Sequence, residues 1–296
     1  MRGWGPGSMM DRNFLARAFE MAATPVWYPL LERTADARLP VPVRAPLFRA
    51  LARLGGIDLS EVDGPLERFA SLGEFFARPL RHDARPVDPD AAAWVSPADG
   101  VLQAVGSFAA GRDPVVPVKG AALPIGRALG PHAEAVSGGG HYFVVYLAPN
   151  DYHRVHSPVS GRVRSWQSVP GTRLPVNRLG FRLRPDVLSS NERVILELEA
   201  TRGGTVFVVL VAAFGVARTR LTFVTGEELR ARAGGAPVAL DPPIPVVRGE
   251  EIGSFNLGST VLVIWPAPGH PVLWMRRAGA VRVGEGVVRG APAGAG

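Results

Sequence analysis

Hydrophobic side chains recur at helical spacing over the first part of the chain, up to about residue 90. This spacing predicts one helix within residues 12–34, interrupted by two prolines, and a shorter helix within residues 46–54. A Ser-x-x-Glu pattern at residues 71–74 is typical of a capping box and marks the start of a third helix. We therefore expect a helical N-terminal region at residues 1–90.

After residue 90 the pattern changes to short apolar runs between turns rich in glycine and proline, which is typical of β-strands. The runs at residues 142–147 and 206–211 are almost continuously apolar, so we expect both strands to be buried on both faces. Neither run reaches the about 18 apolar residues that would span a membrane. Strands are predicted at residues 101–105, 142–147, 161–168, 193–199, 205–214, 261–264 and 281–283.

Together these patterns predict an α+β fold that is mainly β. Residues 91–296 would form a β-sandwich or barrel-like catalytic core, preceded by the helical segment as a membrane-associating region. In that segment the helix at residues 46–54 carries its arginines mostly off its apolar face, and Trp27 and Tyr28 lie beside aliphatic residues. Both features suit a membrane interface, but a helix that caps a protein core has the same pattern, so both interpretations stay open.

The composition limits the chemistry that the chain can use. Its 296 residues include no cysteine, which excludes disulfide bridges, cysteine-ligated zinc and a thiol nucleophile. The formal net charge is +7, and a positive excess suits an anionic partner such as a nucleic acid or a membrane surface. A nucleophile in this chain must therefore be an oxygen or nitrogen atom.

The Gly-Ser-Thr sequence at residues 258–260 has the chemistry of self-cleavage by an N→O acyl shift. Gly258 leaves its carbonyl carbon unshielded and permits strained backbone dihedrals, so the Ser259 hydroxyl can attack it and turn the amide into an ester. β-Elimination then leaves dehydroalanine, which hydrolyses to ammonia and a pyruvoyl group. A ketone at the new N-terminus can form a Schiff base with an amine. A plain turn between two strands explains the same three residues without chemistry.

Two further motifs could support this reaction. Pro-Ala-Asp-Gly at residues 97–100 holds the Asp99 carboxylate in a constrained turn, and His153 and His156 lie three residues apart beside a tyrosine. An imidazole can accept the proton of Ser259, and a carboxylate can orient that imidazole. Asp99 could instead stabilise its own turn, and the histidines could be surface or core residues.

Two other functions use the same residues. Asp99, His153 and His156 could ligate zinc in a metal-dependent hydrolase, with Ser259 incidental. The motifs could also be structural parts of a non-catalytic scaffold on a membrane. Bound metal would favour the first of these interpretations, and an intact chain with a normal N-terminus would favour either over self-cleavage.

Three motifs together resemble the phosphatidylserine decarboxylase family, whose pyruvoyl-dependent enzymes make phosphatidylethanolamine. They are the Pro-Ala-Asp-Gly motif, His-Arg-Val-His-Ser-Pro at residues 153–158 and Leu-Gly-Ser-Thr at residues 257–260. The chain departs from the family at Ser157, where Met is usual, and at residues 211–218, a loose version of a Val-Gly-Ala strand. Both departures bear on how the substrate is received. Shorter similar segments lie at residues 75–78, 84–86, 170–171, 175–177, 191–193 and 248–253.

The resemblance implies a role for each candidate residue. Asp99, His156 and Ser259 would drive cleavage between Gly258 and Ser259. Residues 259–296 would then form a small α chain that begins with a covalent pyruvoyl cofactor (pyruvate) derived from Ser259, and residues 1–258 a large β chain associated with it. His153 would serve the decarboxylation step, as the donor of a proton.

The resemblance also implies the substrate and the place of action. Phosphatidylserine would form a Schiff base with the pyruvoyl group and lose carbon dioxide to give phosphatidylethanolamine. The partner of the basic chain would then be an anionic membrane surface and not a nucleic acid, with the protein peripheral on the cytoplasmic side of the cell membrane. No metal is expected, and a homodimer and the range of acyl chains stay open.

Overall fold

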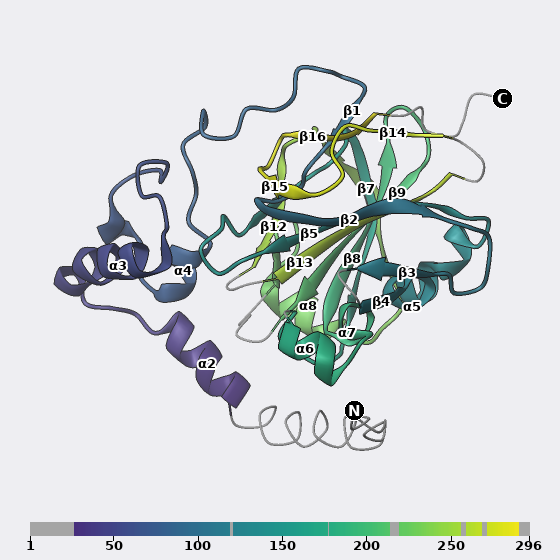
Figure 1. The fold of residues 1–296 in the computed structure, drawn as a ribbon. Coiled ribbons are helices and arrows are strands. Elements are labelled where there is room, and N and C mark those ends of the chain that lie inside the picture. Colours follow the sequence, from purple (N-terminus) through teal and green to yellow (C-terminus); the bar gives the residue numbers. More distant parts are fainter. Residues whose placement is uncertain are drawn as a thin grey trace, which may run out of the picture.

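An eight-stranded antiparallel sheet forms the centre of the molecule (Figure 1). The computed structural model describes residues 27–118, 121–176, 178–213, 219–255, 259–267 and 271–289. Among these residues no pairing joins the two edge strands of the sheet, β11 and β15, so it is open. The expected mainly β fold is confirmed, but the core is not a closed barrel. In spatial order the strands are β11 (Val238–Val246), β7 (Gly161–Val169), β8 (Arg193–Ala200), β9 (Thr205–Ala212), β13 (Ser259–Pro266), β5 (Gly140–Leu147), β2 (Gly100–Phe108) and β15 (Gly279–Val281).

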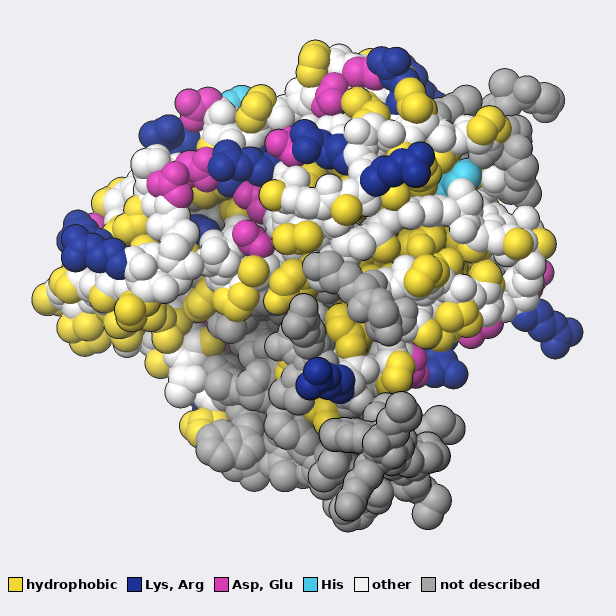
Figure 2. All heavy atoms as spheres, viewed as in Figure 1, with side chains coloured by type: hydrophobic (Ala, Val, Ile, Leu, Met, Phe, Trp, Pro, Cys, Tyr) yellow, Lys and Arg dark blue, Asp and Glu magenta, His cyan; other side chains and the backbone are white. Residues whose placement is uncertain are grey.

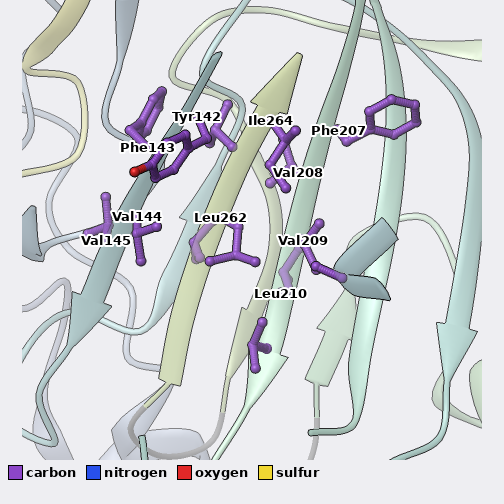
Figure 3. Close-up of a cluster of buried hydrophobic side chains, with 14 of the residues drawn as sticks. Tyr142, Phe143, Val144, Val145, Phe207, Val208, Val209, Leu210, Leu262 and Ile264 are labelled. Atoms are coloured by element: carbon purple, nitrogen blue, oxygen red, sulfur yellow. The ribbon is translucent and has the colours of Figure 1, made fainter. Parts of the chain in front are cut away.

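The three middle strands β9, β13 and β5 are buried almost throughout. Their near-continuous apolar sequences place a hydrophobic side chain on each face of the sheet, and Figure 3 shows many of these side chains packed along neighbouring strands. β13 pairs with β5 along one edge and with β9 along the other. The burial predicted for residues 142–147 and 206–211 is confirmed except at Tyr146, which is half-buried, and the strand at residues 261–264 lies between these two strands.

The sequence located six of the seven described strands of eight or nine residues and located the short strands poorly. It missed the nine-residue strand β11, because an aspartate and three prolines interrupt its apolar pattern. The prediction at residues 281–283 is wrong, because the strand ends at Val281 and the backbone N–H of Val283 leaves the ladder to bind the Asp99 carboxylate at 2.8 Å. Eight shorter strands were not predicted, since two to five residues do not show a period. They are β1 (Ala93–Val95), β3 (Val115–Val118), β4 (Ala121–Pro124), β6 (Arg154–His156), β10 (Thr219–Leu221), β12 (Glu251–Phe255), β14 (Leu273–Trp274) and β16 (Gly286–Arg289).

A helical region with its own small core lies beside the sheet. Phe48, Phe69 and Phe75 form the centre of that core, and the rings of Phe48 and Phe75 stack with their centroids 4.5 Å apart. This separate cluster is compatible with the predicted boundary near residue 90, although it does not test it. The elements are α2 (Trp27–Asp36), α3 (Val41–Gly55), η1 (Leu66–Arg68) and α4 (Leu72–Phe76).

The details of these helices differ from the predictions in instructive ways. The predicted helix at 12–34 lies outside the described residues as far as residue 26, and its predicted interruption at Pro29 is wrong. Pro29 lies in the first turn of α2, where the N–H that proline lacks has no helical partner. The capping box is confirmed, because the Ser71 Oγ accepts from the Glu74 N–H at 3.2 Å, while Glu74 itself accepts from the N–H of Ala70.

Within the described part of the chain, no helix is long and apolar enough to cross a membrane. The remaining helices are short and lie against the large sheet or at its ends (Figure 1). They are α5 (Ile125–Leu129), η2 (Gly130–Val136), α6 (Arg178–Leu183), α7 (Val187–Ser190) and α8 (Gly226–Ala231).

Gly100 is the point at which the sheet fixes the position of Asp99. Its φ of 148° lies in the region that favours glycine, and a Cβ atom here would meet the Tyr146 carbonyl oxygen at 2.0 Å. The backbone of β2 can therefore approach β5 this closely only with glycine at residue 100. Asp99 consequently enters the sheet in a fixed position at the start of β2.

We expect Gly100→Ala to lower the free energy of unfolding by about 2 kcal/mol or more, because backbone must move to admit the new methyl group. Gly111→Ala is the matched control, since nothing lies within 4 Å of a Cβ atom there, and it should change the same quantity by less than about 0.5 kcal/mol. Urea denaturation of both variants measures the difference. Equal stabilities of the two variants would contradict the packing argument.

Candidate active site

Ser259 is the first residue of β13 and is fully buried. Its Oγ has no hydrogen-bond partner among the described residues, and the Oγ1 of Thr260 has none either. A buried hydroxyl without a partner costs about 1–3 kcal/mol, so such a group in a packed core calls for an explanation in function. The other residue of the predicted cleavage site, Gly258, lies outside the described residues.

The register of the sheet shows the direction in which Ser259 points. It lies opposite Ala212 in β9 and Leu147 in β5, and residues opposite one another in an antiparallel sheet share a face. Leu210, two residues before Ala212, points to that face and would lie 3.4 Å from a Cβ atom on Gly253 of β12. The face of Ser259 is therefore the one covered by the small sheet β10-β12-β6.

His153 is fully buried beside the segment that leads to the predicted cleavage site. Its carbonyl oxygen accepts a hydrogen bond from the N–H of Phe255 at 2.9 Å. Its Nδ1 lies 2.9 Å from the carbonyl oxygen of Asp151 and must be the protonated nitrogen there, since a carbonyl only accepts. The Nε2 atom has no hydrogen-bond partner among the described residues. It is therefore a free proton acceptor in a dry environment.

Burial lowers the pKa of His153 to about 4, an effect that the hydrogen bond to the Asp151 carbonyl opposes and the positive charge of Arg78 reinforces. Arg78 is itself buried, and its Nη2 donates to the same carbonyl oxygen at 3.2 Å. His153 is consequently neutral near pH 7, with its lone pair on Nε2.

His156 is held at both ring nitrogens. Its Nδ1 donates to the carbonyl oxygen of Gly249 at 2.8 Å, and its Nε2 accepts from the hydroxyl of Tyr152 at 3.1 Å. Burial lowers the pKa of His156, so this imidazole too is favoured in the neutral form. Its backbone N–H donates to the carbonyl oxygen of Pro97 at 2.8 Å, which brings β6 next to the turn that holds Asp99.

Asp99 is clamped by a partly buried arginine that the sequence did not identify as part of the site. The Nε of Arg85 lies 2.9 Å from both carboxylate oxygens of Asp99, and Nη2 binds Asp99 at 2.5 Å and Glu61 at 2.8 Å. The guanidinium also lies 5.9 Å from the centroid of the Tyr152 ring, within the range of a cation–π contact. Tyr152 and Arg85 therefore connect His156 to Asp99.

The structure brings the three predicted cleavage residues to the same end of the sheet. A Cβ atom on Gly100 would lie 3.3 Å from the Cα of Leu147, and Leu147 is the partner of Ser259. Asp99 thus lies at the start of β2, and only β5 separates β2 from β13, the strand that begins with Ser259. The direct Asp99–His156–Ser259 chain of hydrogen bonds is not formed among the described residues, because the carboxylate and the imidazole have other partners. The roles of these residues stay predictions.

The sequence offered only a weak signal for the residues it missed. The Ala-Arg-Pro segment at residues 84–86 is one of the shorter segments that resemble the family, and Tyr152 is the neighbour of the histidines. Neither pattern indicates which charge or ring nitrogen each side chain binds, because the partners lie on other segments.

The zinc-hydrolase interpretation is not favoured. Within the described ranges, no group of three or more His, Asp or Glu side chains is arranged to hold a metal ion. Asp99 binds Arg85, and the Nδ1 atoms of His153 and His156 both contact carbonyl oxygens. These three residues therefore lack the converging ligand atoms that a zinc site needs.

The low pKa of His153 predicts a pH-dependent stability. The ordinary pKa of histidine is about 6.5. Between that pH and about pH 4, His153 binds a proton in the unfolded chain but not in the folded chain. The free energy of unfolding therefore falls with falling pH. The loss should amount to about 3 kcal/mol. His153→Asn keeps an N–H donor but does not titrate, so the stability difference between parent and variant should change by that amount between pH 7 and pH 4.

The measurement is urea denaturation of both proteins in a Ser259→Ala background, so that each sample is a single uncut chain. His156 is present in both proteins, so its titration cancels in the difference. A stability difference that is independent of pH would show that His153 titrates normally in the folded chain.

Comparisons with known proteins agree with the motifs. The model of the family described as phosphatidylserine decarboxylase matches residues 72–289. A phosphatidylserine decarboxylase proenzyme of Anaeromyxobacter sp. (strain K) is 41% identical over 94% of this chain and 94% of its own length. Proenzymes of the same name from Bordetella pertussis and Azotobacter vinelandii are 36% and 34% identical over 86% of this chain, and over 86% and 90% of their own lengths. The chain belongs to the phosphatidylserine decarboxylase family.

Proposed function

We propose that this chain is a proenzyme that cuts itself before Ser259 and then decarboxylates phosphatidylserine to phosphatidylethanolamine. The observation that carries the proposal is the fully buried Ser259 hydroxyl without a hydrogen-bond partner, at the start of a central strand in a member of this family. The proenzyme in the names of the relatives fits a chain that must be processed.

In the cleavage step, His156 would act as the base. It is neutral, its Nδ1–H is anchored on the Gly249 carbonyl, and its Nε2 lone pair faces the Tyr152 hydroxyl. If the Ser259 hydroxyl replaced the Tyr152 hydroxyl as the hydrogen-bond partner of Nε2, this nitrogen could take the serine proton. The serine oxygen would then attack the carbonyl carbon of the preceding residue. Asp99, held in place by Arg85, would stabilise the positive charge that His156 gains.

The surroundings of Ser259 fit a pyruvoyl group at the same position, since the residue is dry and no side chain competes for its oxygen among the described residues. When formed, that group supplies a ketone that condenses with the substrate amine and takes up the electrons released with carbon dioxide. His153 has the free Nε2 atom that can take a proton from the substrate ammonium and return it to carbon.

The two fragments would remain associated after the cut. The small fragment would begin with β13, which is hydrogen-bonded to β5 and β9 of the large fragment along its two edges. The small fragment also contributes β15, which pairs with β2, and β16, which pairs with β1. Separation would expose a buried and mostly apolar strand and break ladders in two sheets.

We further propose that α3 docks the enzyme on the anionic cytoplasmic face of the cell membrane. The inner face of α3 caps its own small core, while Val41, Val43 and Leu54 are exposed, Leu54 to 87%. Figure 2 shows hydrophobic side chains gathered over this helix, with basic side chains close by. An apolar surface with adjacent arginines suits an anionic bilayer, and a diacyl lipid does not leave the bilayer readily.

Self-cleavage makes a prediction about mass. The purified chain should separate on a denaturing gel into a large fragment that ends at Gly258 and a small one that starts at residue 259, with a blocked N-terminus. Ser259→Ala should give one uncut chain without decarboxylase activity, because the attacking oxygen is gone. Mass spectrometry of the small fragment checks the site, and an intact wild-type chain with a free amino terminus would refute the proposal.

The two histidines provide the internal control of the same experiment. His156→Ala should leave the chain uncut, whereas His153→Ala should still be cut but decarboxylate at least about 100-fold more slowly, the usual loss of a proton-transfer group. Uncut His153→Ala protein together with processed His156→Ala protein would mean that the two roles are reversed.

Membrane docking is tested by Leu54→Asp. The substitution removes an exposed apolar side chain from α3 and adds a negative charge, so binding to phosphatidylglycerol-containing vesicles should weaken about tenfold or more. Val115→Asp is the matched control, because Val115 is 60% exposed on β3, away from the helical region. Vesicle sedimentation measures both. Equal loss of binding in the two variants would argue against docking through α3.

A further inference from the structure

A cavity of about 510 Å³ lies over the end of the large sheet, between β7 and β8 as its floor and β10 and α8 as its roof. Cavities of this size commonly hold small-molecule ligands. Its apolar wall includes Val194, Leu221, Val224 and Leu229. The proposed mechanism assigns this cavity no role.

The cavity opens on the face of the sheet to which Ser259 points. Val194 in β8 lies opposite Leu210 in β9, so the two side chains share a face, and Leu210 shares it with Ala212 and therefore with Ser259. β8 is two strands from β13, which places the cavity floor about 10 Å from Ser259 across the sheet.

The roof of the cavity is tied to the segment before the cleavage site. Thr219 and Leu221, both cavity residues, lie opposite Phe255 and Gly253 in β12. The cavity is consequently a neighbour of the site that contains Ser259, on the same side of the sheet.

Two arginines give the cavity a cationic rim. Arg220 and Arg230 line it, are exposed, and form no ion pair with any of the described carboxylates. The third arginine, Arg173, pairs with Glu192 at 3.1 Å, so this pair adds no net charge. Glu227 is the remaining acidic residue of the lining, and the rim keeps a positive excess.

An apolar wall with unpaired cations at its rim matches a glycerophospholipid, in which a phosphodiester joins the polar head to apolar chains. We propose that this cavity is the binding site for the phosphodiester and adjoining glycerol of the substrate, with Arg220 as the residue that binds the phosphate. Arg220 is preferred because it lies on β10, opposite Ser254, and borders a second hollow between β12 and the helical region. A head group held there can extend its amine across the sheet towards residue 259.

The inference rests on the proposed function, and the experiment separates the two. Processed wild-type enzyme and the variants Arg220→Gln, Arg220→Lys, Arg230→Gln and Arg202→Gln are assayed for carbon dioxide release from phosphatidylserine in neutral detergent micelles. Arg202→Gln is the matched control, because Arg202 lies in the turn between β8 and β9 at the opposite end of the same strands. A wild-type enzyme that releases no carbon dioxide would refute the proposed function itself.

We expect Arg220→Gln to raise KM about tenfold or more with kcat changed much less. The reason is that the variant cannot form the charge-assisted hydrogen bond between residue 220 and the phosphate of the bound substrate. Arg220→Lys should recover part of the affinity, Arg230→Gln should raise KM less than Arg220→Gln, and Arg202→Gln should match the wild type. All variants should be fully cut, because cleavage precedes substrate binding.

Three kinetic results would overturn the inference. They are a wild-type KM in Arg220→Gln, an equal rise of KM in Arg202→Gln, or a loss confined to kcat. Sedimentation with phosphatidylglycerol vesicles completes the test. Unchanged vesicle binding by Arg220→Gln places the effect in head-group recognition, whereas a matching loss of vesicle binding would assign it to bulk membrane attraction and reject the site.

Discussion

The structure depends on the position of β13 between two neighbouring strands. Every residue of β13 except the last is buried. The strand pairs with β5 along its whole length and with β9 over residues 259–264. Such a strand is held by its ladders and its side chains and needs no covalent bond at its N-terminal end. Ser259 is the first residue of that strand. A cut before it therefore leaves the new terminus in the place where the serine was.

The polar groups at this end of the sheet fall into two kinds. Asp99 and His156 are held by several partners each, so the position of the carboxyl group and the tautomer of the imidazole are fixed before any reaction. The Ser259 Oγ and the His153 Nε2 are buried without partners among the described residues. Unpaired buried groups of this kind cost free energy, and the extensive apolar core offsets that cost. In the proposed mechanism the groups that react are the free ones, and the groups that orient are the bound ones.

The sequence predicted what depends on local pattern. Continuous apolar runs located β5 and β9, and the combination of three motifs gave Asp99, the histidines and Ser259. It could not predict what depends on distant segments. The Arg85 clamp on Asp99 joins residues far apart in sequence, and the last predicted strand ended early because the N–H of Val283 turns to the same carboxylate. Short strands such as β6 and β12, which position His156, carry no period of their own.

The two faces of the large sheet are covered by different elements. The residues of β8 alternate, so Arg193 points away from the face of Val194, and its guanidinium binds the carbonyl oxygens of Arg127 and Ala128 at 2.7 and 2.8 Å. These contacts close that face with α5. The opposite face holds Ser259, the small sheet and the cavity under α8. In the proposed function a lipid head group would therefore approach residue 259 from the second face, where Arg220 and Arg230 lie at the rim of the cavity.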